Sequence, residues 1–148
     1  MTMPTDLPNA SASLFASWRI DHAGIRVGDI EAAIGWYSET LDCHMLRRWS
    51  LGSKQFCWLS PPGAAGIIIE LLANSVPDTE PLTADFQLLS RSHLGFLVDS
   101  VDDAVAELTR RKVVVTSEPR DVVEAGRRVA FFVDPWGNLI ELIEPLAA

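Results

Sequence analysis

Two histidines and two glutamates of this chain occupy equivalent positions in an internal repeat. HAGIRV, which begins at His22, reappears as HLGFLV at His93, and IEL around Glu70 reappears around Glu141; both offsets are 71 residues. Imidazoles and carboxylates are metal ligands, so a duplicated half with one of each gives two nitrogen and two oxygen ligands. Such a set suits an octahedral nickel, cobalt, iron or manganese ion with open water positions, and also zinc. The sequence therefore predicts one four-ligand metal site where the halves meet.

The two glutamates stand inside strongly apolar segments. Glu70 interrupts the run IIIELL, and Glu141 interrupts LIELI. A buried carboxylate is costly unless it is paired or coordinates a metal, and here the placement occurs at two repeat-equivalent positions. Either histidine taken alone would more often be a hydrogen-bonded structural residue. We predict no ligand role for His44, because the residue 71 positions later is Val115.

Hydrophobic periodicity predicts a strand, a helix and three further strands in the first half. Residues 20–27 have the pattern of a strand, and Asp29 is placed to cap a helix whose apolar stripe runs from Ile30 to Leu41. Turn signals at GS and PPG separate three short strands, which we predict at residues 45–51, 55–59 and 67–72. The first half therefore has the order βαβββ.

The second half repeats this order. The periodicity predicts a strand at 93–98, a helix at 101–112 and strands at 113–116, 128–133 and 139–143. DPWGN, residues 134–138, is predicted to form the last hairpin turn, with Pro and Gly where such turns require them. We expect a flexible or surface-docked extension at 1–19 and one domain at 20–148. This domain would contain a first module at about 20–74, a partly helical linker at 75–91 and a second module at about 92–148.

Side-chain alternation along the strands decides whether the four ligands can meet. His22, Gly24 and Arg26 share one face of the first strand, and Glu70 shares a face of the fourth strand with Asn74. The repeat puts His93 and Glu141 on the corresponding face of the second half. We therefore expect an α+β fold in which tandem βαβββ modules form curved mixed sheets around a metal-binding groove. The aromatic residues Trp49, Phe56 and Trp58 are expected in ordinary core packing, with a wall of the groove as the alternative.

Composition narrows the setting. The 148 residues suffice for one well-packed domain, and no apolar run approaches the ~20 residues of a membrane span. A formal net charge of −8 disfavours nucleic acid as a partner. Cys43 and Cys57 lie in no CxxC pattern, which indicates reduced thiols, and the first 19 residues lack the pattern of a secretory signal. We expect a cytoplasmic protein.

These residues resemble the vicinal oxygen chelate superfamily, which includes glyoxalase I (lactoylglutathione lyase), methylmalonyl-CoA epimerase, extradiol dioxygenases and fosfomycin or bleomycin resistance proteins. The resemblance covers about residues 20–144 and rests on DPWGNLIEL, residues 134–142, and on the duplicated strand and helix starts. The set His22, Glu70, His93 and Glu141 matches the compact bacterial type of glyoxalase I, which typically works with nickel or cobalt. Epimerases of the superfamily usually carry Gln at the position of Glu70.

The resemblance implies isomerisation of a hemithioacetal of a 2-oxoaldehyde to a 2-hydroxyacyl thioester through an enediolate. Glu141 matches the family's base and would have to leave or loosen from the metal, with Glu70 opposite it as a ligand or second proton carrier. Arg26 and Asn74, each four residues after a ligand, match glutathione-binding residues. Physically, Arg26 lies ~13 Å along the strand from the metal, within reach of a peptide-like thiol. The alternatives are a charge at the groove rim for Arg26 and a turn residue at a strand end for Asn74.

Several features depart from the glyoxalase I pattern. The segment 75–91 is longer than in the compact enzymes, and its Asp78 and Glu80 would disfavour dianionic glutathione. Arg127 and Arg128 lie in the hairpin where further positive groups are expected, with solvated surface charges as the alternative. The small-molecule substrate is thus a glutathione adduct or another thioester-type ligand. Rival functions are an epimerase-like isomerase of a CoA thioester, an Fe(II) extradiol dioxygenase, for which Tyr37 would be the tyrosine available, and a non-catalytic drug-binding resistance protein.

The resemblance also implies a homodimer in which facing halves of two chains complete each groove. His22 and Glu70 of one chain would then join His93 and Glu141 of the other. From the sequence alone, a site within one chain and a site shared between chains both stay open.

Overall fold

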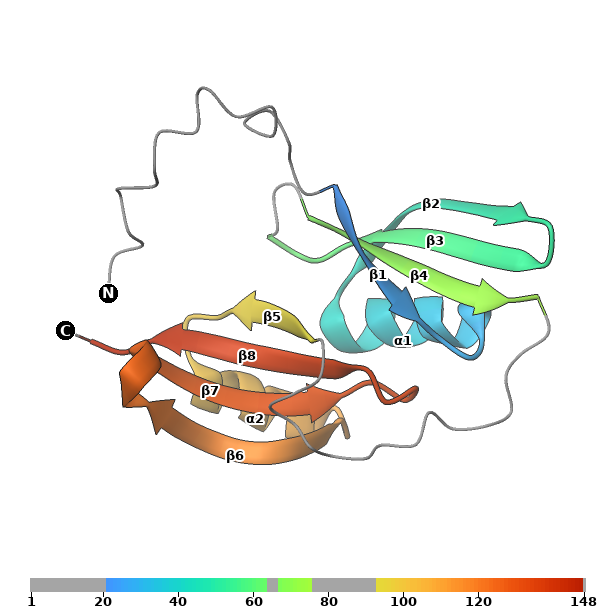
Figure 1. The fold of residues 1–148 in the computed structure, drawn as a ribbon. Coiled ribbons are helices and arrows are strands. Elements are labelled where there is room, and N and C mark those ends of the chain that lie inside the picture. Colours follow the sequence, from blue (N-terminus) through green and yellow to red (C-terminus); the bar gives the residue numbers. More distant parts are fainter. Residues whose placement is uncertain (1–20, 64–66, 76–92, 148) are drawn as a thin grey trace, which may run out of the picture.

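Each half of the chain folds into a four-stranded sheet with one helix packed against it (Figure 1). The computed structural model describes residues 21–63, 67–75 and 93–147. The first module contains β1 (His22–Arg26), α1 (Ile30–Leu41), β2 (His44–Leu51), β3 (Lys54–Ser60) and β4 (Ile68–Asn74). The second contains β5 (Leu94–Leu97), α2 (Val101–Arg110), β6 (Val114–Val122), a 3-10 turn (Val123–Ala125), β7 (Arg127–Val133) and β8 (Leu139–Pro145).

The two sheets have the same topology. Their strand orders are β1-β4-β3-β2 and β5-β8-β7-β6, and in each the first strand pairs in parallel with the last while the other pairs are antiparallel. The register is equivalent as well, because Gly24 lies opposite Glu70 and Gly95 lies opposite Glu141. The α+β fold of tandem βαβββ modules predicted from the sequence is confirmed.

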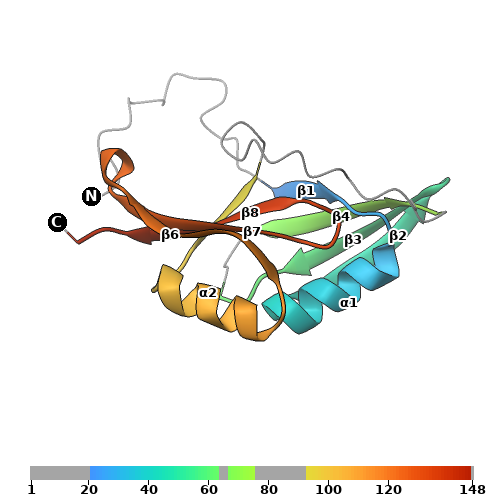
Figure 2. The same ribbon diagram turned by 90° about the horizontal axis from the view of Figure 1, so that it is seen from below.

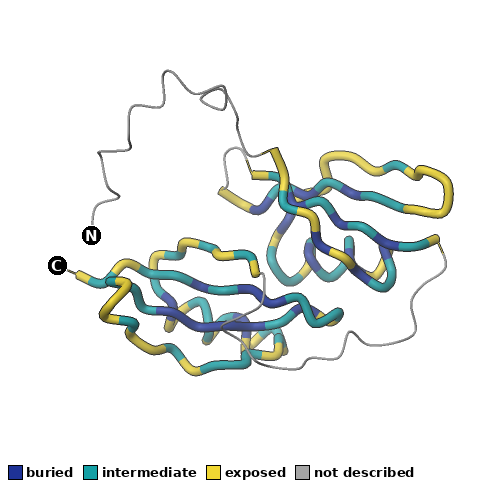
Figure 3. Tube along the Cα trace, in the orientation of Figure 1, coloured by how far each residue is buried: buried dark blue, intermediate teal, exposed yellow. Residues whose placement is uncertain are grey.

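Alternation along β4 separates the core from an open face. Ile69, Leu71 and Ala73 of β4 are buried in the core with α1, so Glu70 must point to the other face of the sheet. Both helices lie on the same side of the two sheets, as Figure 2 shows. The buried residues follow this arrangement and concentrate where the central strands meet the helices (Figure 3). The faces opposite the helices are thus the ones available for chemistry.

The helix starts follow from their caps. The Asp29 side chain accepts a hydrogen bond from the amide of Ala32 at 2.9 Å, as predicted. Ser100 accepts from Asp103 N at 3.2 Å, and Glu144 of β8 accepts from Val101 N at 2.8 Å. The anionic carboxylate at this helix N-terminus also ties α2 to its own sheet.

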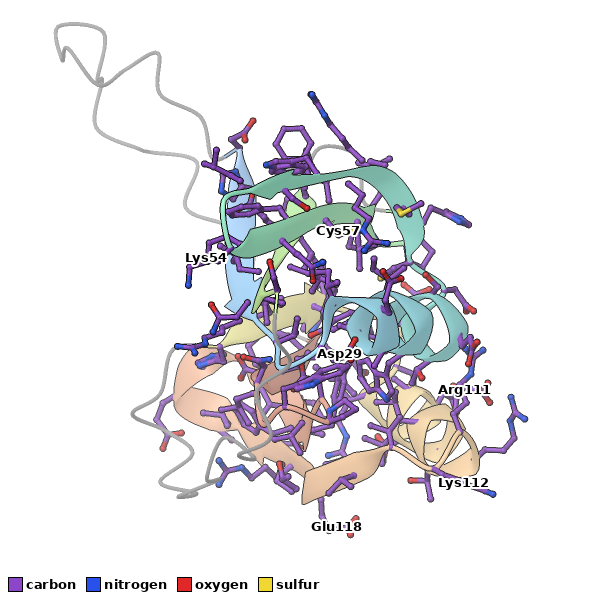
Figure 4. The ribbon with its side chains drawn as sticks, turned by 90° about the vertical axis from the view of Figure 1, so that its right-hand side faces the viewer. Asp29, Lys54, Cys57, Arg111, Lys112 and Glu118 are labelled. Atoms are coloured by element: carbon purple, nitrogen blue, oxygen red, sulfur yellow. The ribbon has the colours of Figure 1, made fainter. Side chains whose placement is uncertain are left out.

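Hydrogen bonds and apolar packing join the modules side by side. Tyr37 of α1 donates to the buried Asp134 at 2.8 Å, and Asn138 Nδ2 donates to the carbonyl of Arg26 at 2.9 Å. On the helical side, Arg111 donates to the carbonyl of Thr40 at 3.0 Å, which satisfies the end of α1; Figure 4 shows Arg111 where α1 and α2 come together. Leu94, Phe96 and Trp136 of the second module pack against the first core.

The sixth strand is the main difference from the sequence prediction. β6 runs to Val122 instead of ending at 116, although it contains Pro119. Register shifts flank this stretch, and β6 is an edge strand, where a missing backbone donor is tolerated. The predicted extension 1–19 and the partly helical stretch of the linker lie outside the described residues. Neither α-helix in the described part of the chain has the length and apolar content that a membrane crossing requires.

Candidate metal centre

The first half of the candidate site lies on the open face of the first sheet. β1 carries His22, the parallel β4 carries Glu70, and His22 Nε2 lies 3.6 Å from Glu70 Oε1. The indole Nε1 of Trp58, on β3, donates to Glu70 Oε2 at 2.7 Å. Only 12% of the Glu70 side chain is exposed, so the carboxylate is largely shielded from water and is held by the Trp58 hydrogen bond.

A neighbouring carboxylate fixes the ring of His22. His22 Nδ1 donates to Asp21 Oδ2 at 2.8 Å. This hydrogen bond raises the pKa of His22, partial burial opposes the shift, and the nearby Glu70 charge adds to it. With the proton held on Nδ1, Nε2 is the nitrogen that faces Glu70 and offers a lone pair to a metal. Asp21 is therefore an outer partner of the kind that orients ligating imidazoles.

The second half of the site repeats the geometry on the second sheet. His93, just before β5, places Nε2 3.1 Å from Oε2 of Glu141 on β8. A Cβ added at Gly95 would lie 3.8 Å from Glu141 Oε2 and 2.9 Å from Ile143 Cδ1. A larger residue at this position would therefore collide with Ile143, while its distance to the carboxylate would be an ordinary van der Waals contact. The His93 ring meets the edge or face of Phe131 at a centroid distance of 5.9 Å.

The structure brings the four predicted ligands together as two pairs. Within the described residues, no group of three or more His, Cys, Asp or Glu side chains lies close enough to hold one metal ion. A four-ligand cluster inside one chain is therefore not formed. The reason lies in the packing: α1 and α2 cover the same side of neighbouring sheets, so the open faces do not fold over one another (Figure 2). Each pair is left on an open face.

One end of the first sheet gathers polar and basic groups. Because β1 and β4 are parallel, Arg26 and Asn74 both lie at the end of the sheet that is remote from His22. Lys54, which the sequence analysis missed, pairs with Asn74 across β3 and β4 and donates to its Oδ1; Figure 4 shows Lys54 at this end of the sheet. The signal was the turn at residues 52–53, which places Lys54 opposite the end of the next strand.

The second sheet carries its own basic groups near Glu141. A cavity of about 280 Å³ is lined by Glu141, Arg120 and Arg127 together with apolar side chains of β7 and β8. Arg128 points to the other face, where it donates to Asp102 at 2.6 and 2.9 Å and to Asp121 at 2.8 Å. Arg127 is thus available to a ligand on the open face, and Arg128 is a structural ion-pair residue.

Aromatic rings cover the open face of the first sheet. Trp49 and Phe56 stack at 5.2 Å with an interplanar angle of 4°, and Trp49 meets Trp58 in a T-shaped contact at 5.1 Å. All three rings are only half-buried, and none belongs to the buried core. The expectation that they are ordinary core residues is wrong; alternation along β2 and β3 places them on the face that carries Glu70.

Tyr37, Cys43 and Cys57 are buried in the protein core, away from the candidate metal site. Tyr37 is fully buried, and burial raises its pKa, with Asp134 as its hydrogen-bond partner. Cys43 and Cys57 are buried free thiols, and burial raises the pKa of Cys43 to about 11. These groups lie on the helical side of the sheets and cannot reach either His–Glu pair. His44 is exposed at the start of β2.

Residues 19–142 match the family model described as the Glyoxalase/Bleomycin resistance protein/Dioxygenase superfamily. A probable lactoylglutathione lyase of Vibrio cholerae is 31% identical over 134 residues, which cover 85% of this chain and 90% of that protein. A probable chloroplastic lactoylglutathione lyase of Arabidopsis thaliana is 30% identical over 129 residues. In that case the match covers 85% of this chain and only 35% of the relative, so the chain spans about a third of the plant protein.

Solved structures share the fold. The trypanothione-dependent glyoxalase I of Leishmania major is 28% identical, with a TM-score of 0.64 over 86% of this chain and 87% of that one. TnmS3, an antibiotic-binding protein of Streptomyces sp. CB03234, is 26% identical, with a TM-score of 0.67 over 88% of this chain and 98% of that one.

Proposed function

We propose a function from one premise: the chain belongs to the Glyoxalase/Bleomycin resistance protein/Dioxygenase superfamily. The proposed activity is that of a metal-dependent, glyoxalase I-like lyase, which converts the hemithioacetal of a thiol and a 2-oxoaldehyde to a 2-hydroxyacyl thioester. The observation that carries the proposal is the pair of repeat-equivalent His–Glu arrangements on the open sheet faces. The lactoylglutathione lyases among the relatives support it.

The two His–Glu pairs carry the nitrogen and oxygen donor atoms that divalent metal ions bind. His22 and Glu70 supply one nitrogen and one oxygen, and His93 and Glu141 supply the same set. Since the pairs lie apart within one chain, we propose that two chains form a homodimer and that the His22 pair of each faces the His93 pair of the other. Nickel or cobalt is the proposed ion, with zinc, iron and manganese as alternatives. When bound, the ion would stabilise negative charge on the two neighbouring oxygens of the substrate.

The chain's own residues then move the proton and hold the thiol. Glu141 takes the proton from the carbon that bears sulfur and hydroxyl and returns it to the former carbonyl carbon through an enediolate, while the hydroxyl proton passes from the first substrate oxygen to the second. No atom is gained or lost, so the step is an isomerisation that needs no further reactant. Arg26 and Asn74, with Lys54 beside them, bind carboxylate and amide groups of a glutathione-like thiol, and Arg120 and Arg127 face its other charged end. The buried free thiols fit a cytoplasmic location.

Elemental analysis and turnover of one preparation test this function. Protein purified without chelator is assayed for bound metal and then, with each metal added, for thioester formation from methylglyoxal and glutathione, with trypanothione and coenzyme A as alternative thiols. We expect stoichiometric metal, turnover in the nickel or cobalt form, and a loss of kcat of about 10²- to 10⁴-fold in Glu141→Gln, which keeps the shape of the side chain but cannot accept the proton. Full metal occupancy without turnover of any thiol adduct would contradict the lyase function.

A ligand-binding role is the second candidate. Its basis is the stacked Trp49–Phe56 pair on the open face, together with the likeness to an antibiotic-binding protein. A dioxygenase is less well supported, because Tyr37 is buried and bonded to Asp134 on the far side of the sheet. Binding of a planar antibiotic by metal-free protein, with no turnover of thiol adducts, would favour the binding role over both enzymes.

A further inference from the structure

The two glutamates are repeat-equivalent but have different cross-strand neighbours. Across β3 and β4, Trp58 lies opposite Glu70, and across β7 and β8, Phe131 lies opposite Glu141. Directly opposed residues point to the same face of a sheet and contact each other. Each carboxylate therefore has one aromatic ring beside it, but only the indole carries a hydrogen-bond donor.

Because of this donor, the two carboxylate oxygens of Glu70 have different partners. Oε2 accepts from Trp58 Nε1 at 2.7 Å, while Oε1 lies 3.6 Å from His22 Nε2. A carboxylate that is bonded at one oxygen and faces an imidazole at the other keeps a single orientation. Trp58 is held in turn by its T-shaped contact with Trp49.

Among the described residues, no side chain on the facing strand donates a hydrogen bond to Glu141. Its Oε2 lies 3.1 Å from His93 Nε2. Its cross-strand neighbour Phe131 packs against the His93 ring and has no hydrogen-bond donor. Rotation of Glu141 about its side-chain bonds breaks no hydrogen bond to its cross-strand neighbour.

We propose that Trp58 is a positioning residue whose indole N–H fixes Glu70 as the carboxylate that stays on the metal, and that the Trp58–Phe131 difference leaves Glu141 free to move. This inference rests on the proposed function and assigns unequal tasks to the two halves of a duplicated site. The tryptophan acts through Glu70 and touches neither substrate nor metal.

Metal affinity is the direct test. Trp58→Phe keeps an aromatic ring but removes the indole donor, and Trp36→Phe, which makes the same change in ring size, is the matched control, since Trp36 packs on the helical side against both cores. Nickel is titrated into metal-free full-length protein by calorimetry, and thermal unfolding verifies that each variant is folded. We expect a loss of about 10- to 100-fold in nickel affinity for Trp58→Phe, as for other outer partners of metal ligands, and no change for Trp36→Phe.

Two further measurements separate positioning from a merely structural role. In a Glu70→Ala background, Trp58→Phe should cause no further loss of affinity, because the indole acts only through Glu70. At saturating nickel, kcat of Trp58→Phe should stay within about threefold of the parent, since the proton is moved by Glu141. Unchanged nickel affinity in Trp58→Phe, or additive losses in the double variant, would overturn the proposal.

The experiments distinguish a failure of the proposed lyase function from a failure of the proposed role of Trp58. A parent protein that binds nickel and turns over no thiol adduct refutes the lyase activity, while the affinity difference between the tryptophan variants still decides the positioning role. A parent protein that binds no metal refutes both.

Discussion

At the level of single residues, the bond between Asp21 and His22 decides which ring nitrogen is left for a metal. Asp21 holds the proton on Nδ1 and raises the pKa of His22. Metal binding requires the neutral imidazole, so protons compete with the metal as the pH falls through this raised pKa. If His22 binds a metal as we propose, the same contact would orient the ligand and make metal binding sensitive to mild acid.

Asp21→Asn should separate these effects. Above the pKa of His22, nickel affinity should fall by about tenfold, because the ring is less well oriented and less basic. In the variant, the pKa of His22 should move back toward 6.5, so nickel affinity should begin to decline at a lower pH than in the parent. The difference in nickel affinity between parent and variant should therefore become smaller in acid. Calorimetric titrations between pH 5 and 8, spanning the range around the ordinary histidine pKa of about 6.5, measure both changes. Asp103→Asn, the same charge change on the exposed surface of α2, should leave the profile unaltered.

Arg26 should affect substrate binding rather than the proton transfer. It lies at the end of β1 remote from His22, so the contact that we propose with the thiol would be the same before and during the reaction. Arg26→Ala should raise KM for the thiol adduct about tenfold with little change in kcat. Arg128→Ala is the control, because its guanidinium is bonded to Asp102 and Asp121 on the helical face. An equal rise in KM in both variants would contradict a specific role of Arg26.

At the level of elements, the turn at residues 134–138 of the second module is hydrogen-bonded to the first module. Asp134 is buried and accepts hydrogen bonds from Tyr37 of α1, from the amides of Trp136 and Asn138, and from the Asn138 side chain. Burial raises the pKa of Asp134, and these donors oppose the rise. Asn138 also bonds to the carbonyl of Arg26, so the hairpin fixes the end of β1.

Tyr37→Phe should lower the free energy of unfolding by about 1–3 kcal/mol, because it leaves a buried carboxylate with one donor fewer. Urea unfolding monitored by circular dichroism measures this loss, and nickel affinity should not change. Thr109→Val, which removes an exposed hydrogen bond within α2, should cost less than about 0.5 kcal/mol. A stability loss no larger than that control would show that the Tyr37–Asp134 bond does not help to hold the modules together.

At the level of the whole molecule, the two His–Glu pairs lie apart within one chain, and we therefore predict that a complete site requires two chains. If each site combines the His22 pair of one chain with the His93 pair of another, His22→Ala and His93→Ala are each inactive alone. A heterodimer of the two variants nevertheless contains one intact site. Random pairing on co-expression should therefore restore about a quarter of the parent activity and metal binding. Sedimentation velocity measures the dimer, and complete absence of restored activity in a mixed dimer would contradict the shared site.

The fold was largely predictable because its determinants are local. Alternation and helical periodicity located each strand and helix, and Asp29 marked the start of α1. The length of β6 was missed, since a proline reads as a stop unless the strand lies at an edge, and edge position is set by pairing with β7. Trp58 was expected in the core for a similar reason: the face on which it lies, and its contact with Glu70, depend on the register of β3 with β4.

The sequence by itself determined the duplication, the order of elements and the four candidate ligands. A repeated sequence forms the same module twice, so repeat-equivalent residues lie at equivalent positions on equivalent strands. Only the tertiary structure decided how these residues are grouped. Packing of α1 and α2 on one side of neighbouring sheets leaves two separate His–Glu pairs, and cross-strand register gives an indole donor to Glu70 and a phenyl ring to Glu141. These features depend on contacts between segments far apart in the chain, for which local periodicity carries no signal.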